Sequence, residues 1–489
     1  MSTHSYRPEL HVTAETGILD APAGVLLDGS RDGTWHLFYQ YRPTPEAPGR
    51  WAHVVSEDGP FDWEVCDDVL VPVGGETELR AGSVVAAARP GDVDLYFTSV
   101  TAAGTSIQRA QLSDIGDTCP ISDDALALDP RVRRLGDVVS DRDDRIRFRS
   151  PCVVPDWESA EDRDAGHEGW LMLAVTGPKG RPSAVVLTSH DGQAWTFQGP
   201  LTFDNDPGFD EAAVVVGPRI LRLRDEVDGE IYDILLVTLE ASGRDVSGYL
   251  VGTLTGANFA VTTPFTRVDR GHDFTRPRNT NVTPGTVPAA NRYDQSVLFG
   301  LLNGVGRGDE PLNHASMAEE GWANVISLPR VITLQGGVLF QTPPPGLPDA
   351  IARTHHARSW TGLCEVPEGA SLSAELIDAA GHTAATVSHT GNELILDRSM
   401  NPHHRGDAPA RAELAEGDSD SLSIFVDGSC VEVFADGGAI AMSSRVYIDG
   451  GCSDIRVSTS GAAEVIRGWH REPVNSRQLP DYGEPSPDE

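Results

Sequence analysis

Two stretches of the sequence share one pattern: SEDGPFDW at residues 56–63 and SHDGQAW at residues 189–195. In both, Ser, Asp, Gly and Trp come in the same order, after one β-like run and before the next. Self-similarity of this kind is typical of repeated, stacked four-stranded units. The repeat therefore favours a β-propeller.

The sequence around these stretches also reads as β-structure. Short β-branched and aromatic runs are bounded by turn residues, and the 50 Gly and 34 Pro leave no long window with helical apolar spacing. The chain is therefore predicted to be nearly all-β. The clearest predicted strands are Thr34–Tyr41, Asp94–Val100, Trp170–Thr176, Ala184–Ser189, Tyr232–Leu239 and Ser296–Leu302.

A proline-rich connector divides the chain. QTPPPGLP at residues 341–348 cannot continue a central strand. Beyond it, Ser421–Val426, Cys430–Ala435 and Ile440–Ile448 form an alternating meander around short turns, as in a β-sandwich. The predicted organisation is a β-propeller over 1–340, a β-sandwich over 350–470 and a disordered acidic tail over 471–489.

Charge and cysteine content limit the partners. The formal net charge of −35 argues against nucleic acid and anionic membranes, and favours a neutral ligand. No signal-like N-terminus and no apolar run of about 18 residues is present, so a cytoplasmic protein is expected. The six cysteines lack CxxC spacing and neighbouring histidines, which predicts buried free thiols, with no metal site and no cofactor.

A series of motifs resembles glycoside hydrolase family 32, the invertase and levanase family. They occur in the family's order: RPELH (7–11), GILDAPAG (17–24), WHLFYQYRP (35–43), FRSP (148–151), FDEAA (209–213), DRGHDF (269–274) and FVDGSCVEVF (425–434). The resemblance implies a five-bladed propeller whose central pocket binds a fructosyl unit, followed by the sandwich. It also implies a substrate that contains fructose, such as sucrose, a phosphorylated sucrose or a short fructan.

Retaining glycosidases use one carboxylate as nucleophile and a second carboxyl group as acid/base. The resemblance implies that Glu211 is the acid/base, with Asp210 as a competitor and a rim position as the structural alternative. At the nucleophile position this chain has Ala21, and at the third carboxylate position it has Ser150. Asp20 could replace the nucleophile if a local bulge turned it inward; otherwise it forms an Asx turn.

Other residues match sugar contacts of the family. The resemblance implies that Gln40 and Trp51 bind the sugar, although a propeller tryptophan is equally often part of the core. Arg149 would brace Glu211 or Asp20, with Ser150 beside it, and Asp273 would line the pocket. His53 is either a pocket-wall residue or a structural histidine.

Three functions stay open. The first is a β-fructofuranosidase-like hydrolase or a transfructosylase. The second is a pseudoenzyme that binds fructosyl sugars without cleaving them. In the third, Glu211 and another carboxylate such as Asp20 or Asp273 support an inverting reaction, for which the two groups would lie about 6.5–9.5 Å apart.

Overall fold

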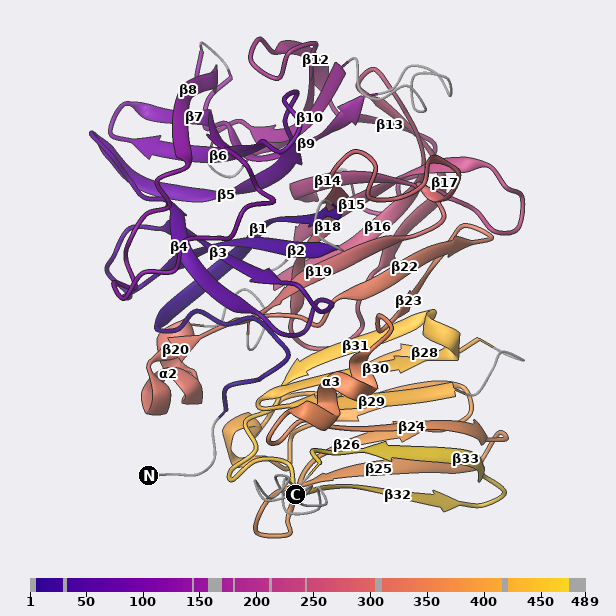
Figure 1. Ribbon diagram of the computed structural model, residues 1–489. Helices are drawn as coiled ribbons and strands as arrows, with labels where there is room; N and C mark the ends of the chain where they lie inside the picture. The colour runs from indigo at the N-terminus through magenta and orange to yellow at the C-terminus, as the bar shows by residue number, and fades with distance from the viewer. Residues whose placement is uncertain are drawn as a thin grey trace, which may run out of the picture.

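The protein is described here by a computed structural model, which covers residues 6–29, 33–142, 145–156, 169–178, 181–210, 213–241, 244–303, 310–415 and 421–474. Nearly all regular structure in these ranges is β, which confirms the predicted class (Figure 1). Two short helices, α2 (Ala315–Glu320) and α3 (Leu347–Arg353), accompany the strands. In this part of the chain no helix is long and apolar enough to cross a membrane.

The first two thirds of the chain form groups of antiparallel strands that follow the chain order. The first three groups are β1 (Gly17–Asp28), β2 (Thr34–Arg42), β3 (Arg50–Ser56) and β4 (Glu64–Leu70); β5 (Glu76–Ala86), β6 (Val93–Thr101), β7 (Gly104–Leu112) and β8 (Val132–Ser140); and β9 (Arg149–Asp156), β10 (Gly169–Thr176), β11 (Ser183–Ser189) and β12 (Thr196–Pro200).

Two further groups complete this part. They are β14 (Val214–Arg224), β15 (Ile231–Ala241), β16 (Arg244–Thr255) and β17 (Asn258–Arg267), with β13 (Thr202–Asp204) at the edge; and β18 (Phe274–Val282), β19 (Ser296–Leu302), β22 (Arg330–Gln335) and β23 (Val338–Thr342), with β20 (Trp322–Ala323) and β21 (Val325–Ile326) alongside. A parallel pairing of β18 with β1 joins the last group to the first. The six strands predicted between Thr34 and Leu302 all fall within these elements.

The first strands of these groups contact one another in a closed ring. β1 contacts β5, β5 contacts β9, β9 contacts β14, β14 contacts β18, and β18 returns to β1. Side chains tie the ring together: Arg219 of β14 donates to the Gly82 and Ser150 carbonyls, and Asn281 of β18 donates to the Val84 carbonyl at 2.7 Å. The ends of these five first strands therefore lie close together around the ring.

The repeated motif has a local physical cause. Both copies form the turn after the third strand of a group, between β3 and β4 and between β11 and β12. In each, the serine hydroxyl closes the turn: Ser56 Oγ donates to the Gly59 carbonyl, and Ser189 Oγ accepts from the Gly192 N–H at 2.9 Å. Serine suits this position because its hydroxyl bonds to nearby backbone groups.

The C-terminal third forms two five-stranded sheets around a shared apolar core that includes Trp360, Leu376 and Leu422 (Figure 1, lower part). One sheet holds β24 (Arg358–Glu365), β29 (Ser421–Asp427), β30 (Cys430–Ala435), β31 (Ile440–Arg445) and β33 (Glu464–Arg471); the other holds β25 (Ser371–Ile377), β26 (Thr383–His389), β27 (Glu393–Asp397), β28 (Ala410–Glu413) and β32 (Asp454–Ser460). Of the predicted tail, 475–489 lie outside the described residues, and the Val474 N–H donates to the Ala352 carbonyl at 3.0 Å.

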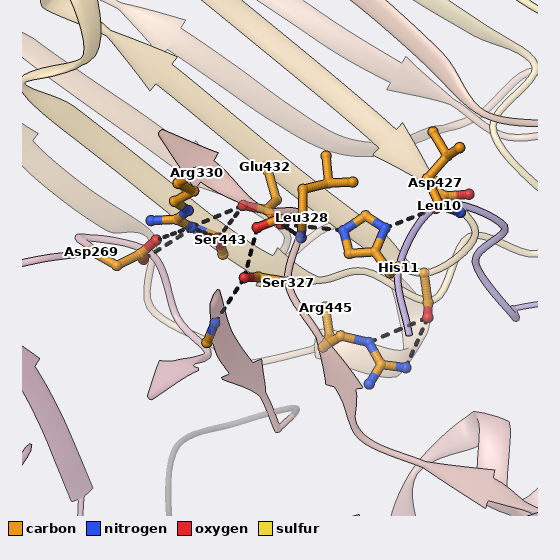
Figure 2. A network of polar contacts seen from close by, with 12 residues as sticks. Leu10, His11, Asp269, Ser327, Leu328, Arg330, Asp427, Glu432, Ser443 and Arg445 are labelled. Carbon is orange, nitrogen blue, oxygen red and sulfur yellow. Dashed lines mark hydrogen bonds and ion pairs between the residues drawn. The ribbon is translucent and has the colours of Figure 1, made fainter. Parts of the chain in front are cut away.

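A buried polar network joins the two parts (Figure 2). Arg330 of β22 forms ion pairs with Asp269 at 2.8 Å and with Glu432 of β30 at 2.9 Å. His11, in the N-terminal segment, lies between Glu432 at 3.2 Å and Asp427 at 2.8 Å. Burial alone would raise the pKa of Glu432, but Arg330 and His11 lower it to about 2. The network therefore contains positively and negatively charged side chains that are buried between the two parts of the chain.

Candidate active site

A β-bulge in β1 positions Asp20. Leu19 pairs with Tyr41 and Ala21 with Gln40, so Asp20 is an extra residue with no partner of its own in β2. A bulge puts two residues opposite one and redirects a side chain that regular alternation would send to the other face. The Asp20 carboxylate accordingly lies beside Gln40, whose Nε2 donates to Oδ2 at 3.3 Å.

Arg42 is the main partner of Asp20. Its Nε donates to Oδ2 and its Nη2 to Oδ1, both at 3.0 Å, in a two-pronged ion pair. Burial by itself would lower the pKa of Arg42, but the hydrogen bonds and charge of Asp20 raise it. The Asp20 side chain keeps 19% of its surface exposed. The sequence analysis did not assign Arg42 a role.

Ala21 and Trp51 belong to an apolar cluster. Ala21 is buried in the same cluster as Trp51 and Phe38. Trp51 is completely buried and donates its indole N–H to the Arg80 carbonyl at 3.3 Å. It therefore exposes no ring face on which a sugar could stack in this conformation.

Gln40 links Asp20 to the neighbouring group of strands. While its Nε2 faces Asp20, its Oε1 accepts from the buried Ala81 N–H of β5 at 2.7 Å. Both ends of the amide are thus used, and this bonding fixes which end faces Asp20.

Ser150, the second residue of the inner strand β9, has a strained conformation. Its φ of 57° lies in the left-handed region, which serine rarely adopts. Its N–H donates to Thr98 Oγ1 at 3.1 Å, and its carbonyl accepts from Arg219 at 3.1 Å. The neighbouring Arg149 is half-buried and donates to the Arg147 carbonyl at 3.2 Å.

Glu211, the predicted acid/base, lies outside the described residues, so its role stays a prediction. Asp210, its competitor, is exposed.

Asp273 serves the contact between the two parts of the chain. It is completely buried, and its Oδ2 accepts from Arg398 Nη1 and from the Arg445 N–H, both at 2.7 Å. Both donors belong to the C-terminal sheets or their connections. This differs from the predicted place in the wall of a sugar pocket, because the carboxylate neutralises an arginine buried between the two parts of the chain.

Two residues that the sequence analysis missed support the bulge. Arg276 donates to the Asp20 carbonyl, and Asn324 Nδ2 donates to the Leu19 carbonyl at 2.9 Å. Their φ angles are 50° and 68°. Left-handed non-glycine residues are concentrated at functional sites, where the surrounding structure holds the strain. Only coordinates could reveal this signal.

A cavity of about 610 Å³ lies at the opposite ends of the same inner strands. Each of the five contributes to its lining, as Leu27, Val85, Val154, Ile220 and Asn281 do, together with the segment 283–297. Of the predicted site residues that the structure describes, none lines it. The bulge and this cavity thus mark two different ends of the ring of inner strands.

Family models match both parts of the chain. The glycosyl hydrolases family 32 N-terminal domain matches residues 11–343, and the family 32 C-terminal domain matches residues 371–470. The chain belongs to glycoside hydrolase family 32. This membership confirms the predicted family and makes the protein a glycosidase of the β-fructofuranosidase type.

Family 32 relatives cover nearly the whole chain. The sucrose-6-phosphate hydrolase of Bacillus subtilis is 25% identical over 94% of this chain and 93% of its own length. The Escherichia coli sucrose-6-phosphate hydrolase is 23% identical over 91% of this chain and 90% of its own length.

Solved structures of the family share the fold. The exo-inulinase from Aspergillus awamori is 19% identical, with a TM-score of 0.75 over 97% of this chain and 99% of its own. A variant of the Bombyx mori β-fructofuranosidase in complex with sucrose is 21% identical, with a TM-score of 0.70 over 96% of this chain and 94% of its own. The overall fold of this chain is thus shared with these solved structures.

Proposed function

We propose that the protein is a β-fructofuranosidase-type hydrolase in which Asp20 is the nucleophile and Glu211 the acid/base. The substrate is sucrose, a phosphorylated sucrose or a short fructan. The observation that carries the proposal is the bulge in β1, which turns the Asp20 carboxylate toward Gln40 although Ala21 occupies the usual nucleophile position.

The chemistry follows the retaining scheme. Asp20 attacks the anomeric carbon of the fructosyl unit while Glu211 protonates the departing glycosidic oxygen. Glu211 then takes a proton from water, which releases fructose from the Asp20 ester; a sugar hydroxyl in place of water would give transfer. In this proposal Gln40 and Ser150 bond to fructosyl hydroxyls, and Arg149 contributes positive charge beside them.

We also propose the corresponding architecture: a five-bladed propeller over 1–340 and a sandwich over 350–470. The closed ring of β1, β5, β9, β14 and β18 supports the blade number, since each is the first strand of a four-stranded antiparallel group. The connector between β23 and β24 supports the boundary.

A second candidate function is sugar binding without cleavage. The observation that favours it is the two-pronged ion pair between Arg42 and Asp20, because a carboxylate whose two oxygens are engaged by a guanidinium is a weaker nucleophile. The burial of Ala21 among apolar side chains points the same way.

The deciding experiment compares wild-type protein with Asp20→Asn and with Asp123→Asn, an exposed aspartate, as the matched control. Release of fructose is measured with sucrose, sucrose 6-phosphate and 1-kestose, and binding is measured by calorimetry. We expect an active wild type, an unchanged control, and a loss of at least ~10³-fold in kcat for Asp20→Asn with binding retained.

Robust activity in Asp20→Asn would refute Asp20 as the nucleophile. A wild type that binds these sugars without turning them over would instead establish the second candidate. In that case the double change Ala21→Asp and Ser150→Asp should create hydrolysis, because it restores the attacking group and the electrostatic support for the oxocarbenium-like transition state.

A further inference from the structure

A cluster of metal-ligating side chains lies inside the first group of strands, away from the candidate active site. His36 of β2, His53 of β3 and Cys119, in the segment between β7 and β8, each offer one ligand atom, and these atoms lie within 4.8 Å of one another. All three residues are buried. They are far apart in the sequence, which is why the spacing of cysteines and histidines gave no sign of them.

The three ligand atoms lie close enough to meet at one ion. His53 contacts both other residues, through Nε2 to His36 Nδ1 at 3.1 Å and through Nδ1 to Cys119 Sγ at 3.9 Å, and it would bind an ion through one of these nitrogens. Around Zn²⁺, bond lengths of about 2.0–2.1 Å to nitrogen and about 2.3 Å to sulfur place neighbouring ligand atoms roughly 3.3–3.8 Å apart. Because the ligand atoms of His36, His53 and Cys119 lie within 4.8 Å of one another, shifts of about 1 Å would bring them to these separations.

Cys66 offers a fourth ligand beside Cys119. Cys66 of β4 pairs with His53 across the β3–β4 ladder, and its thiol is within hydrogen-bonding reach of Cys119 in a common buried cluster. The segment that carries Cys119 is bound to β4 next to this contact, through Asp67. The Asp67 N–H donates to the Pro120 carbonyl at 2.9 Å, and the Ser122 N–H donates to Asp67 Oδ1 at 2.8 Å.

Hydrogen bonding among these side chains does not satisfy all of their polar atoms. Within the described residues, His36 Nε2 is buried and has no hydrogen-bond partner. A buried polar atom without a partner costs free energy, and such exceptions call for an explanation such as an ion. Because the rings of His36 and His53 are already in contact, a bound cation would accept one nitrogen lone pair from each ring.

We propose that Cys66, Cys119, His36 and His53 form a structural Zn²⁺ site of the Cys₂His₂ type. On binding, the two thiols release their protons to solvent, and each imidazole stays neutral with one N–H. Two thiolates balance the charge of the ion, so the complex is electrically neutral and suited to a buried place. The site fastens β2, β3 and β4 to the segment that covers them, and all four coordination positions are filled, as in structural rather than catalytic sites.

The test uses the full-length protein, kept reduced and loaded with zinc during expression. Elemental analysis should find about one zinc per chain in the wild type and less than about 0.1 in Cys119→Ser. The matched control is Cys452→Ser, which changes a buried thiol in the core of the C-terminal sheets and should keep the full zinc content.

A second measurement needs no variant that could misfold. Co²⁺ added to zinc-free wild type should give the visible bands of a tetrahedral ion and a thiolate charge-transfer band, and Cys66→Ser should reduce the latter to about half by removing one of two thiolates. Zinc-free wild type without these bands would overturn the proposal. So would full zinc content in Cys119→Ser, or a Cys66–Cys119 disulfide in protein isolated from zinc-supplemented cells.

Discussion

At the bulge in β1, two neighbouring residues lie in different surroundings, one apolar and one polar. Ala21 packs among apolar side chains, while the Asp20 carboxylate is held by Gln40 and Arg42. Gln40 connects the site to the neighbouring strand, because the side-chain amide that donates to Asp20 also accepts from the buried Ala81 N–H. A change at this residue should therefore affect both stability and the site.

Replacing Gln40 by Ala leaves the Ala81 N–H buried without an acceptor. We expect the free energy of unfolding to fall by about 1–3 kcal/mol, the cost of an unsatisfied buried donor. Urea unfolding monitored by tryptophan fluorescence measures this change. The control, Gln198→Ala, removes an exposed amide that bonds only to Thr188 Oγ1 among the described contacts, and should change the midpoint little. Equal midpoints for the two variants would contradict the assigned role of Gln40.

At the scale of elements, the inner strands pack so closely that their side chains are restricted in size. Gly24 of β1 lies directly against β5: a Cβ added there would lie 2.8 Å from both the backbone nitrogen and Cγ2 of Val84. The same two strands carry Asp20 and Ala81 at the end of the ring where the candidate site lies. Their close approach therefore helps to set the geometry of the site.

Gly24→Ala should force β1 and β5 apart and destabilise the protein by about 1–3 kcal/mol, as overpacking does. Thermal unfolding followed by circular dichroism provides the measurement. Gly75→Ala is the matched control, because a Cβ at that position has no atom within 4 Å and its φ is not positive. If both variants melted at the same temperature, the contact between the inner strands would be looser than described.

At the scale of the whole molecule, the two parts of the chain are joined by buried charges as well as by apolar contacts. Arg330, which is completely buried, connects Asp269 and Glu432, while His11 connects Glu432 and Asp427 (Figure 2). Burial alone would lower the pKa of His11, but the two carboxylates raise it to about 9. A buried pair of this kind makes stability depend on pH.

The sign follows from the two pKa values of His11, 6.5 in the unfolded chain and about 9 in the folded protein. Its contribution is fully present below pH 6.5 and is lost as the pH rises through about 9. We expect the wild type to lose up to about 3 kcal/mol over this range, and His11→Gln to show a flatter profile. Urea unfolding at a series of pH values tests this.

The control for the pH experiment is His382→Gln, which removes an imidazole with 79% of its surface exposed. It should reproduce the wild-type dependence. A His11→Gln profile as steep as that of the wild type would assign the pH dependence to other groups.

The amino-acid sequence by itself determined the all-β class, the strands and the family. Alternating runs such as Cys430–Ala435 and the serine-closed turns are local features, so short-range chemistry specifies them. The family could also be predicted from the sequence, because many short motifs, each a local feature, occur in the family's order. The sequence also raised the possibility of a bulge at Asp20.

Only the tertiary structure decided which side chains meet. It brought Arg42 to Asp20, turned Asp273 toward Arg398, and buried Trp51 completely. It also gathered Cys66 and Cys119 around His53, although the segment carrying Cys119 follows three more strands in the chain. The reason is physical: periodicity specifies the face of a strand, whereas contacts between strands depend on register, bulges and the packing of sheets, which no local pattern encodes.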